Sequence, residues 1–335
     1  MVLFNHTGTD GFVLFTVRQE SRFFWIYLFN AIFIKMGVPL FFMASGALLI
    51  GKEESLKQLV KKRFSKYLTV LIVGSIIQYF YMCLISNPQV PSVSTFLTLL
   101  YTGNLAVAYW YLYAYLAFIL MLPLIRRLAK AMTNKEYLWM TIMFGFINFL
   151  SILDYLIWKG ESVHNGSFSL FITTSYLFYP LMGYFIDQRM SERFLTWKLF
   201  FVLTIVSIIA IVICCYMTVY RCEIIGEWVE ASCQYFFTTL IFIPTITFFI
   251  GAKLLFTKYT PKETTCAIIS KLGGATFGIY LIENILRQIT YPVFVFLKPY
   301  IRTLPACWVW ILVACIVGTI VSLILKRIPI IKHYI

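Results

Sequence analysis

The stretch LFFVLTIVSIIAIVICCYMTV, residues 199–219, contains no charged residue. A helix needs about 20 mostly apolar residues to cross the hydrocarbon core of a bilayer, and this stretch is long enough. The same criterion finds nine segments along the chain, each of which is predicted to form a membrane-spanning helix. Their predicted bounds are 29–50, 67–86, 107–125, 137–158, 168–186, 198–219, 234–256, 273–297 and 306–325.

The composition of the whole chain agrees with this pattern. Its 335 residues are 61% hydrophobic and 13% charged, with a mean hydropathy of +0.84. Soluble domains are about 25% charged, and a single water-soluble core of this size could not bury so much apolar surface. We therefore predict an all-α, multi-pass protein of the plasma membrane, with the lipid bilayer as its solvent. Neither an internal repeat nor a soluble domain interrupts the pattern, so residues 1–335 are predicted to form one membrane domain.

The positive charge follows the predicted loops. The net charge is +14, but nucleic-acid binding needs a basic face on a soluble domain, and here Lys and Arg form short blocks between apolar runs. No nucleic-acid partner is predicted. Of the 28 Lys and Arg residues, Lys35 lies inside a span and seven lie in one set of alternate loops: Arg18, Arg22, Lys159, Arg221, Arg287, Lys298 and Arg302. The remainder lie in the other loops and the C-terminal tail, which the positive-inside rule places in the cytoplasm.

This orientation has a consequence for the amino terminus. Nine spans with a cytoplasmic tail would start Met1 on the outer side, yet residues 1–17 lack the features of a signal peptide. The simplest explanation is that MVLFNH, residues 1–6, is the end of a first helix. We expect about 15–20 further, mostly apolar residues upstream, giving ten transmembrane helices with both ends in the cytoplasm.

The eight cysteines show no spacing typical of a metal site, so no metal is predicted. Cys222 and Cys233 share one polar loop. They can form a disulfide if this loop faces an oxidising space, and two separate thiols are the alternative.

Ionisable residues at membrane depth are costly, and each suggests a function. His6 follows the first apolar stub and has the residue type of a general base near neutral pH, although an interfacial histidine bonded to water or Asp10 is the alternative. Lys35 and Ser45 lie in KMGVPLFFMASGALLIG, residues 35–51. Helix packing explains the small residues, including Ser45, whereas Lys35 either has a function or extends to the outer interface. Glu283 is expected about ten residues into an apolar helix. It either forms a structural ion pair with Arg287 one turn later or orients or protonates a group at the outer end of the cavity.

Two further groups are candidates for ligand binding. Lys61, Lys62, Arg63 and Lys66 gather at the entrance to one helix, which suits a phosphate-bearing cofactor, anionic lipid or simple topology marking. Trp110 and Tyr113 lie in YWYLYAYL, residues 109–116, where an aromatic belt at the interface and sugar stacking are both consistent with the pattern.

Four stretches together resemble the acyltransferase-3 family of bacterial membrane acyltransferases. They are GVPLFFMASGALL (37–49), KKRFSKYL (61–68), YWYLYAYLAFILMLPLIRR (109–127) and ATFGIYLIENIL (275–286). The likeness keeps their order and spacing in a ten-helix frame and extends from about His6 to Ile335. It implies transfer of an acyl group from cytoplasmic acyl-CoA to surface polysaccharides, and it is strongest for the branch that O-acetylates glycans.

The resemblance also assigns roles to residues. It implies that His6 is the essential histidine of the first helix, and that the arginine eleven residues before it falls upstream of Met1. Arg63 and Lys66 look like the arginine pair that binds the phosphates of the donor, with lysine in the second place, where it cannot form a bidentate contact. Trp110 is similar to the tryptophan that opens the fourth helix. Glu283 stands where many members carry a histidine.

The expected reaction is O-acylation of a hydroxyl on a surface polysaccharide or its lipid-linked sugar precursor, with acetyl-CoA as the most favoured donor. Three groups of site residues are predicted: His6 and Glu283 for catalysis, Arg63, Lys66 and Lys62 for the donor, and Lys35, Ser45, Trp110 and Tyr113 for the acceptor. The rival functions are a transporter or flippase of glycan precursors and a catalytically inactive relative. Transporters usually show internal repeats and paired broken helices, and the sequence predicts neither.

Overall fold

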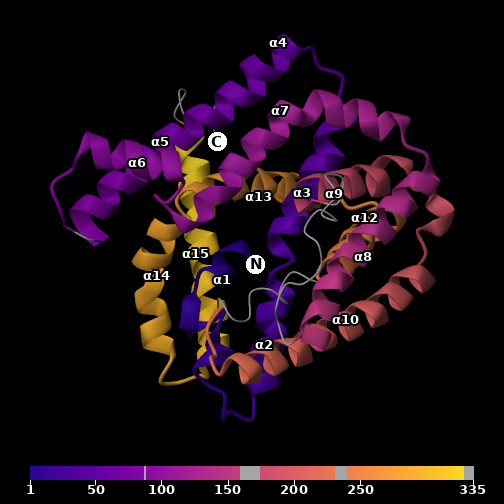
Figure 1. Ribbon diagram of the computed structural model, residues 1–335. Helices are drawn as coiled ribbons and strands as arrows, with labels where there is room; N and C mark the ends of the chain where they lie inside the picture. Colours follow the sequence, from indigo (N-terminus) through magenta and orange to yellow (C-terminus); the bar gives the residue numbers. More distant parts are fainter. Residues whose placement is uncertain (87, 159–173, 231–239, 328–335) are drawn as a thin grey trace. The chain divides into compact units, whose positions relative to one another are not determined.

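The computed structural model describes residues 1–86, 88–158, 174–230 and 240–327. Within these ranges every regular element is a helix (Figure 1). In the described part of the chain, six helices are long and apolar enough to cross a membrane: Phe24–Leu49, Leu56–Ile85, Trp110–Ala131, Asn134–Trp158, Trp197–Ile225 and Thr303–Leu325. The predicted all-helical class is thus confirmed and several apolar spans are found. The count of ten spans and the side on which each terminus lies stay predictions.

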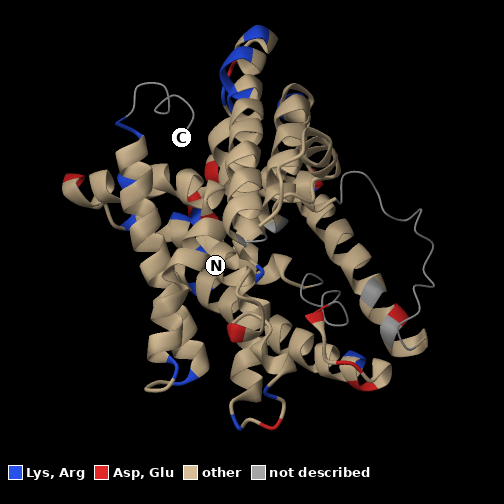
Figure 2. Ribbon diagram, turned by 90° about the vertical axis from the view of Figure 1, so that its left-hand side faces the viewer, with Lys and Arg blue, Asp and Glu red and all other residues tan. Residues whose placement is uncertain are grey.

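Many apolar side chains on these helices are exposed. Phe201 and Ile205 of one helix, and Leu312 of another, are each about 60% exposed (63%, 59% and 61%). Figure 2 shows that Lys, Arg, Asp and Glu lie mostly at helix ends and turns, whereas the helix bodies are largely uncharged. Apolar surface of this extent is stable only against lipid or another protein. The chain is accordingly a membrane protein.

The chain forms two compact units built from interleaved parts of the sequence. The first unit comprises residues 1–52 and 124–260, and the second comprises residues 53–123 and 261–335. Helix α7 (Trp110–Ala131) begins in the second unit and ends in the first. The other helices of the first unit are α1 (Val2–Asn5), α2 (Phe24–Ile34), α3 (Gly37–Leu49), α8 (Asn134–Trp158), α9 (Ser175–Tyr184), α10 (Trp197–Ile225) and α12 (Phe242–Lys258). Those of the second unit are α4 (Leu56–Leu59), α5 (Ser65–Tyr81), α6 (Val93–Thr102), α13 (Glu263–Leu281), α14 (Glu283–Leu297) and α15 (Thr303–Leu325).

The first predicted span, 29–50, is interrupted in its first third. Helices α2 and α3 meet at a turn formed by Lys35 and Met36. Pro39 explains the position of this turn, because proline has no N–H to donate to the carbonyl four residues earlier, which belongs to Lys35. The turn therefore lies one helical turn before the proline, and it places Lys35 at a helix end.

Helices α3 and α9 of the first unit pack backbone against backbone. A Cβ atom added to Gly46 would lie 1.9 Å from the carbonyl oxygen of Pro180, and one added to Gly183 would lie 2.0 Å from that of Met43. Real Cβ contacts are essentially never shorter than 3.0 Å. The small residues in GVPLFFMASGALL thus serve close helix packing, which is a common means of association inside membranes.

Two arginines of the first unit stabilise helix C-termini. Arg126 is buried and donates from Nε and Nη2 to the carbonyl of Leu49 at the end of α3, at 3.2 and 2.9 Å. Arg189 donates from Nη1 to the carbonyls of Ala129 and Met132 at the end of α7, at 3.1 and 2.8 Å. Cations at these positions satisfy unpaired carbonyls and oppose the negative end of the helix dipole. These basic residues therefore have local structural roles besides any effect on topology.

The helix predicted to start at residue 67 starts earlier, at Leu56. Ser55 and Gln58 form a capping box, in which each side chain accepts from the other residue's backbone N–H at 3.2 Å. This motif satisfies N–H groups that a helix start would otherwise leave unpaired. Residues Val60–Phe64 then form a π turn. The basic segment that the sequence indicated as a loop is thus part of the helix.

The segment 273–297, predicted as one helix, is two helices. Helices α13 and α14 are bent by 93° at Ile282, and α14 packs beside α15 (Figure 1). Glu283 is therefore the first residue of α14, and the prediction that it lies about ten residues into a helix is wrong. A carboxylate is favourable at this position, because the first N–H groups of a helix are unpaired and its dipole is positive there.

Other predicted elements are described only in part. Residues 159–173 and 231–239 are not described, so the segments predicted at 168–186 and 234–256 are represented by α9 and α12. Cys233 lies outside the described residues, while Cys222 is fully buried near the end of α10. Helix α6 was not predicted, because its ten residues are too short for a span.

Candidate active site

A concentration of positive charge lies around the start of α5, in the second unit. Arg63, the fourth residue of the π turn, is held by Glu54, with its Nε 2.9 and 3.1 Å from the two carboxylate oxygens and its Nη2 2.7 Å from one of them. Lys66 lies one turn later and is half-buried, whereas Lys62 is exposed. A π turn in an α-helix is frequently found at a functional site. The predicted donor residues thus lie close together along the chain, and Glu54 already accepts from two of the three guanidinium nitrogens of Arg63.

The C-terminal end of α15 contributes to the same region. Lys326 donates from Nζ to the carbonyl of Gly274 in α13 at 2.7 Å. The ring of Tyr67, which follows Lys66 in α5, lies 5.2 Å from that of Phe277, one turn after Gly274 in α13, so Lys66 and Lys326 belong to the same region. The sequence indicated Lys326 only as a marker of topology, since 260 residues separate it from Lys66 and no local motif links them.

Two reciprocal hydrogen bonds hold the bend between α13 and α14. The hydroxyl of Tyr109 donates to the carbonyl of Leu281 at 2.9 Å, and the hydroxyl of Tyr280 donates to the carbonyl of Ala108. Gly74 of α5 makes room, because a Cβ there would lie 2.9 Å from the Tyr109 hydroxyl oxygen. A carbonyl freed by a helix break must find a partner at membrane depth, and Tyr109 provides it.

A row of aromatic rings connects the cationic cluster to this bend. The ring of Tyr67, next to Lys66, lies 4.7 Å from that of Tyr115, which lies 5.7 Å from that of Tyr111. Tyr111 in turn lies 5.7 Å from Tyr280. Because α5, α7 and α13 each contribute rings, the row fixes these three helices of the second unit against one another. It runs from the half-buried cations to the start of α14.

Glu283 and Arg287 form a close, buried pair at the start of α14. Glu283 is 3% exposed, and its carboxylate lies 3.9 Å from Nε of Arg287. Trp310 of α15 fixes the neighbouring turn, since its Nε1 donates to Oγ1 of Thr290 at 3.0 Å and to the carbonyl of Arg287 at 3.3 Å. A carboxylate buried in this way is expensive unless it is paired or used. Glu283 therefore keeps both interpretations that the sequence allowed, a structural ion pair and a functional acid.

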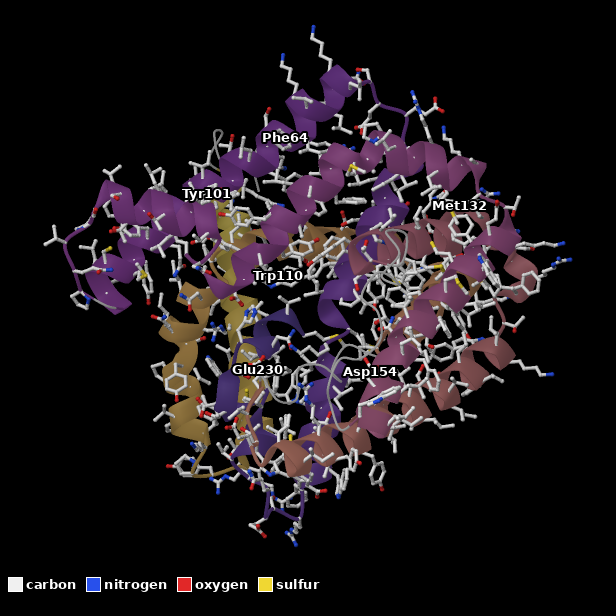
Figure 3. All side chains as sticks on the ribbon, in the orientation of Figure 1. Phe64, Tyr101, Trp110, Met132, Asp154 and Glu230 are labelled. Atoms are coloured by element: carbon white, nitrogen blue, oxygen red, sulfur yellow. The ribbon has the colours of Figure 1, made fainter. Side chains whose placement is uncertain are left out.

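Trp110 and Tyr113 occupy the start of α7, in the second unit. Trp110 is the first residue of the helix and is 42% exposed (Figure 3). Tyr113 donates its hydroxyl to the carbonyl of Leu100, near the end of α6. The Trp110 indole is thus accessible to a ligand, whereas the Tyr113 hydroxyl anchors a neighbouring helix.

The remaining predicted residues lie in the first unit. His6 ends α1, its backbone N–H donates to the carbonyl of Leu3 at 3.2 Å, and its side chain is half-buried. Thr7 fixes the following turn, since its Oγ1 donates to the carbonyl of Phe4 at 2.7 Å and accepts from the N–H of Phe12 at 2.9 Å. The histidine therefore stands on a backbone that buried contacts hold in place.

Lys35 and Ser45 belong to the same unit as His6. The ammonium of Lys35 lies 4.5 Å from the centre of the Phe12 ring and 4.0 Å from the carboxylate of Glu230. Ser45 donates its hydroxyl to the carbonyl of Phe41 at 2.8 Å, a bond that satisfies it within its own helix. The predicted site residues thus divide between the two units, with His6, Lys35 and Ser45 in the first.

Comparison with known proteins identifies the family. The family model described as an acyltransferase domain, that of the acyltransferase-3 family, matches residues 1–327. The chain belongs to this acyltransferase family. No curated protein and no solved structure matches the chain.

Membership of this family, together with the long apolar helices, makes the chain a membrane acyltransferase. The match includes both units, so the cationic cluster, the aromatic row and His6 all lie within the acyltransferase domain. Sequence reasoning indicated His6, Arg63 and Lys66, but it missed Glu54, Tyr109 and Lys326. The partners of Tyr109 and Lys326 are distant in sequence, and Glu54 lies nine residues before its partner Arg63, outside the helix. No periodic pattern in the sequence indicates contacts of this kind.

Proposed function

We propose that this acyltransferase moves an acyl group, by preference acetyl, from cytoplasmic acyl-CoA to a hydroxyl of a surface glycan or its lipid-linked precursor. The observation that carries the proposal is the match to an acyltransferase domain over residues 1–327 of an all-helical, strongly apolar chain. An enzyme embedded in a membrane can take a donor from one side and an acceptor from the other. The plasma membrane is the compartment in which both substrates are available.

The donor is assigned to the cationic cluster of the second unit. Coenzyme A carries several phosphate charges, and Arg63, Lys66 and Lys62 supply positive charge at the start of α5. Glu54 holds Arg63 in a fixed orientation, so part of its guanidinium is already engaged. Lysine ammonium groups then carry more of the phosphate binding than an arginine pair would.

His6 is assigned as the general base. It takes the proton of the acceptor hydroxyl while the oxygen attacks the thioester carbonyl, which forms a C–O bond and a tetrahedral oxyanion. Collapse of this intermediate breaks the C–S bond, and the CoA thiolate leaves and takes up the proton. Glu283 is assigned to orienting or protonating a group near the acceptor. Lys35, Ser45, Trp110 and Tyr113 are assigned to the acceptor.

A transporter of glycan precursors is the rival function, and one observation favours it. The bent pair α13 and α14 is a broken span or a re-entrant loop, a feature that the sequence, which predicts no paired broken helices, did not indicate. Transporters of this kind usually carry broken helices in corresponding pairs, and one bent pair is found in the described part of the chain. The acyltransferase match therefore outweighs the bend.

Deletion of the gene tests the reaction. We expect surface glycans from the deletion strain to lose one acetyl mass per modified sugar, and a plasmid copy to restore it, as measured by mass spectrometry of isolated glycans. A loss of a larger acyl mass would replace acetyl by that group. Unchanged O-acyl groups with accumulation of unexported precursor would instead indicate the transporter.

Substitution of His6 tests the base and separates an active enzyme from an inactive relative. We expect His6→Ala to lower transfer by at least about 100-fold, the usual contribution of a general base, without changing Tm or expression. Complementation of the deletion strain and thermal unfolding of the purified variant measure both quantities. Near-normal product from His6→Ala would remove His6 from the mechanism.

A further inference from the structure

Lys326 does not lie on a loose tail. It caps the C-terminal end of α15, where its backbone N–H donates to the carbonyl of Ser322 at 3.0 Å. Its side chain is half-buried, and Nζ donates to the carbonyl of Gly274 at 2.7 Å. The Lys326 side chain is thus held both at its backbone and at its ammonium, which reduces the conformational entropy that it would lose when a ligand binds.

A pair of glycines in α13 leaves space beside this ammonium. A Cβ added to Gly274 would lie 3.1 Å from Nζ of Lys326, tighter than most real contacts. A Cβ added to Gly273 would have no heavy atom within 4 Å. Any side chain at residue 274 would therefore crowd the ammonium, while the adjacent surface is open. An ammonium has three donors, and one of them binds Gly274.

Like charges gather around Lys66. The Tyr67 ring, next to Lys66, packs 5.2 Å from the Phe277 ring, so the start of α5 lies beside the part of α13 that Lys326 contacts. Lys66 is half-buried there, and Arg63 and Lys326 act on its ammonium as repelling charges. Glu54 pairs with Arg63, but within the described residues neither Lys66 nor Lys326 has a carboxylate within ion-pair distance. Clustered cations raise the local positive potential, which a bound anion would neutralise.

We propose that Lys326 is a third phosphate-binding residue of the donor site, acting with Lys66 and Arg63 on the phosphate groups of coenzyme A. The proposal rests on the acyl-CoA donor of the proposed function. Since Glu54 already engages Nε and Nη2 of Arg63, the two lysines offer most of the donors that remain. Because Gly273 and Gly274 have no side chains, a phosphate has access to the Lys326 ammonium.

Binding of CoA to the purified full-length chain in phosphatidylcholine nanodiscs tests the proposal. We expect Lys326→Ala to weaken CoA binding about 10-fold, as for loss of one hydrogen bond to a charged group, and Lys326→Arg to retain most of the affinity. The affinity of Lys326→Ala should also fall less steeply with added NaCl than that of the unsubstituted chain, because one phosphate–cation pair is missing. A purely structural role would not change the salt dependence. Lys258→Ala, an exposed lysine at the end of α12, is the control and should bind normally.

Three outcomes would overturn the proposal, and they have different meanings. No CoA binding by the unsubstituted chain would overturn the acyl-CoA donor, and Lys326 with it. Normal CoA binding by Lys326→Ala, at an unchanged Tm, would overturn the role of Lys326 alone. If Lys326→Ala binds CoA normally but retains less phosphatidylglycerol on purification from mixed lipid, the cluster binds lipid headgroups instead.

Discussion

The hydroxyl of Tyr109, just before α7, donates to the carbonyl of Leu281 at the end of α13. Its ring is buried, and the missing side chain of Gly74 in α5 leaves the space that the hydroxyl occupies. We expect Tyr109→Phe to destabilise the protein by about 1–3 kcal/mol, because the carbonyl of Leu281 then lacks its partner away from water. Thermal unfolding in detergent should show a Tm lower by several degrees.

Tyr101→Phe is the matched control for this substitution. The chemical change is the same, but Tyr101 of α6 is 91% exposed. Its hydroxyl is open to solvent, so removing it leaves no buried group without a partner, and Tm should stay unchanged. A Tyr109→Phe protein as stable as the Tyr101→Phe protein would show that water or another group satisfies the Leu281 carbonyl.

Packing of α3 against α9 is decided at the level of whole helices. Gly46 and Gly183 each face a backbone carbonyl of the other helix, and a rigid backbone cannot move aside as a flexible side chain can. We expect Gly46→Ala and Gly183→Ala each to destabilise the protein by about 1–3 kcal/mol, the usual cost of overpacking. Measurement of Tm and of the yield of folded protein from membranes checks this.

Gly51→Ala provides the control for the glycine substitutions. It follows the C-terminal end of α3, and its added Cβ would make an ordinary contact of 3.6 Å with the Tyr184 ring. The first unit should tolerate this change without loss of Tm. Equal stability of the Gly46→Ala, Gly183→Ala and Gly51→Ala proteins would contradict the close approach of α3 and α9.

Membrane topology is a property of the whole molecule. It depends on whether the bent pair α13 and α14 crosses the bilayer or returns to the same side. If the pair spans the bilayer, the residues before α13 and those after α14 lie on opposite sides. We predict this arrangement, with Lys258 in the cytoplasm and Tyr300 outside, because Lys253, Lys258 and Lys262, in the last turns of α12 and just after it, belong to the more basic set of connecting segments.

Single cysteines at these two positions test the topology in a chain whose eight native cysteines are replaced by alanine. Tyr300 is 75% exposed, so a membrane-impermeant maleimide added to intact cells should label the Tyr300→Cys protein. The same reagent should label the Lys258→Cys protein only after lysis. Labelling of both positions from the same side would mean that α13 and α14 form a re-entrant loop.

The local pattern of apolar residues predicted most of the architecture. Hydropathy and helix length are properties of contiguous sequence, so the membrane class and the six long apolar helices could be read directly. The order of the four motifs in residues 37–286 was enough to predict the acyltransferase family, which the match over residues 1–327 confirms. The errors were of a different kind: the early start at Leu56 depends on a cap, and the bend at Ile282 depends on partners elsewhere.

By itself, then, the sequence determined that lipid is the solvent of this protein and that its chemistry is acyl transfer, because both are carried by runs and motifs of adjacent residues. Only the tertiary structure decided which side chains meet. Tyr109 and Leu281 are 172 residues apart, and Lys326 lies 52 residues from Gly274. Such contacts arise when separate helices bury their polar groups together, and no period along one helix records the identity of a partner on another.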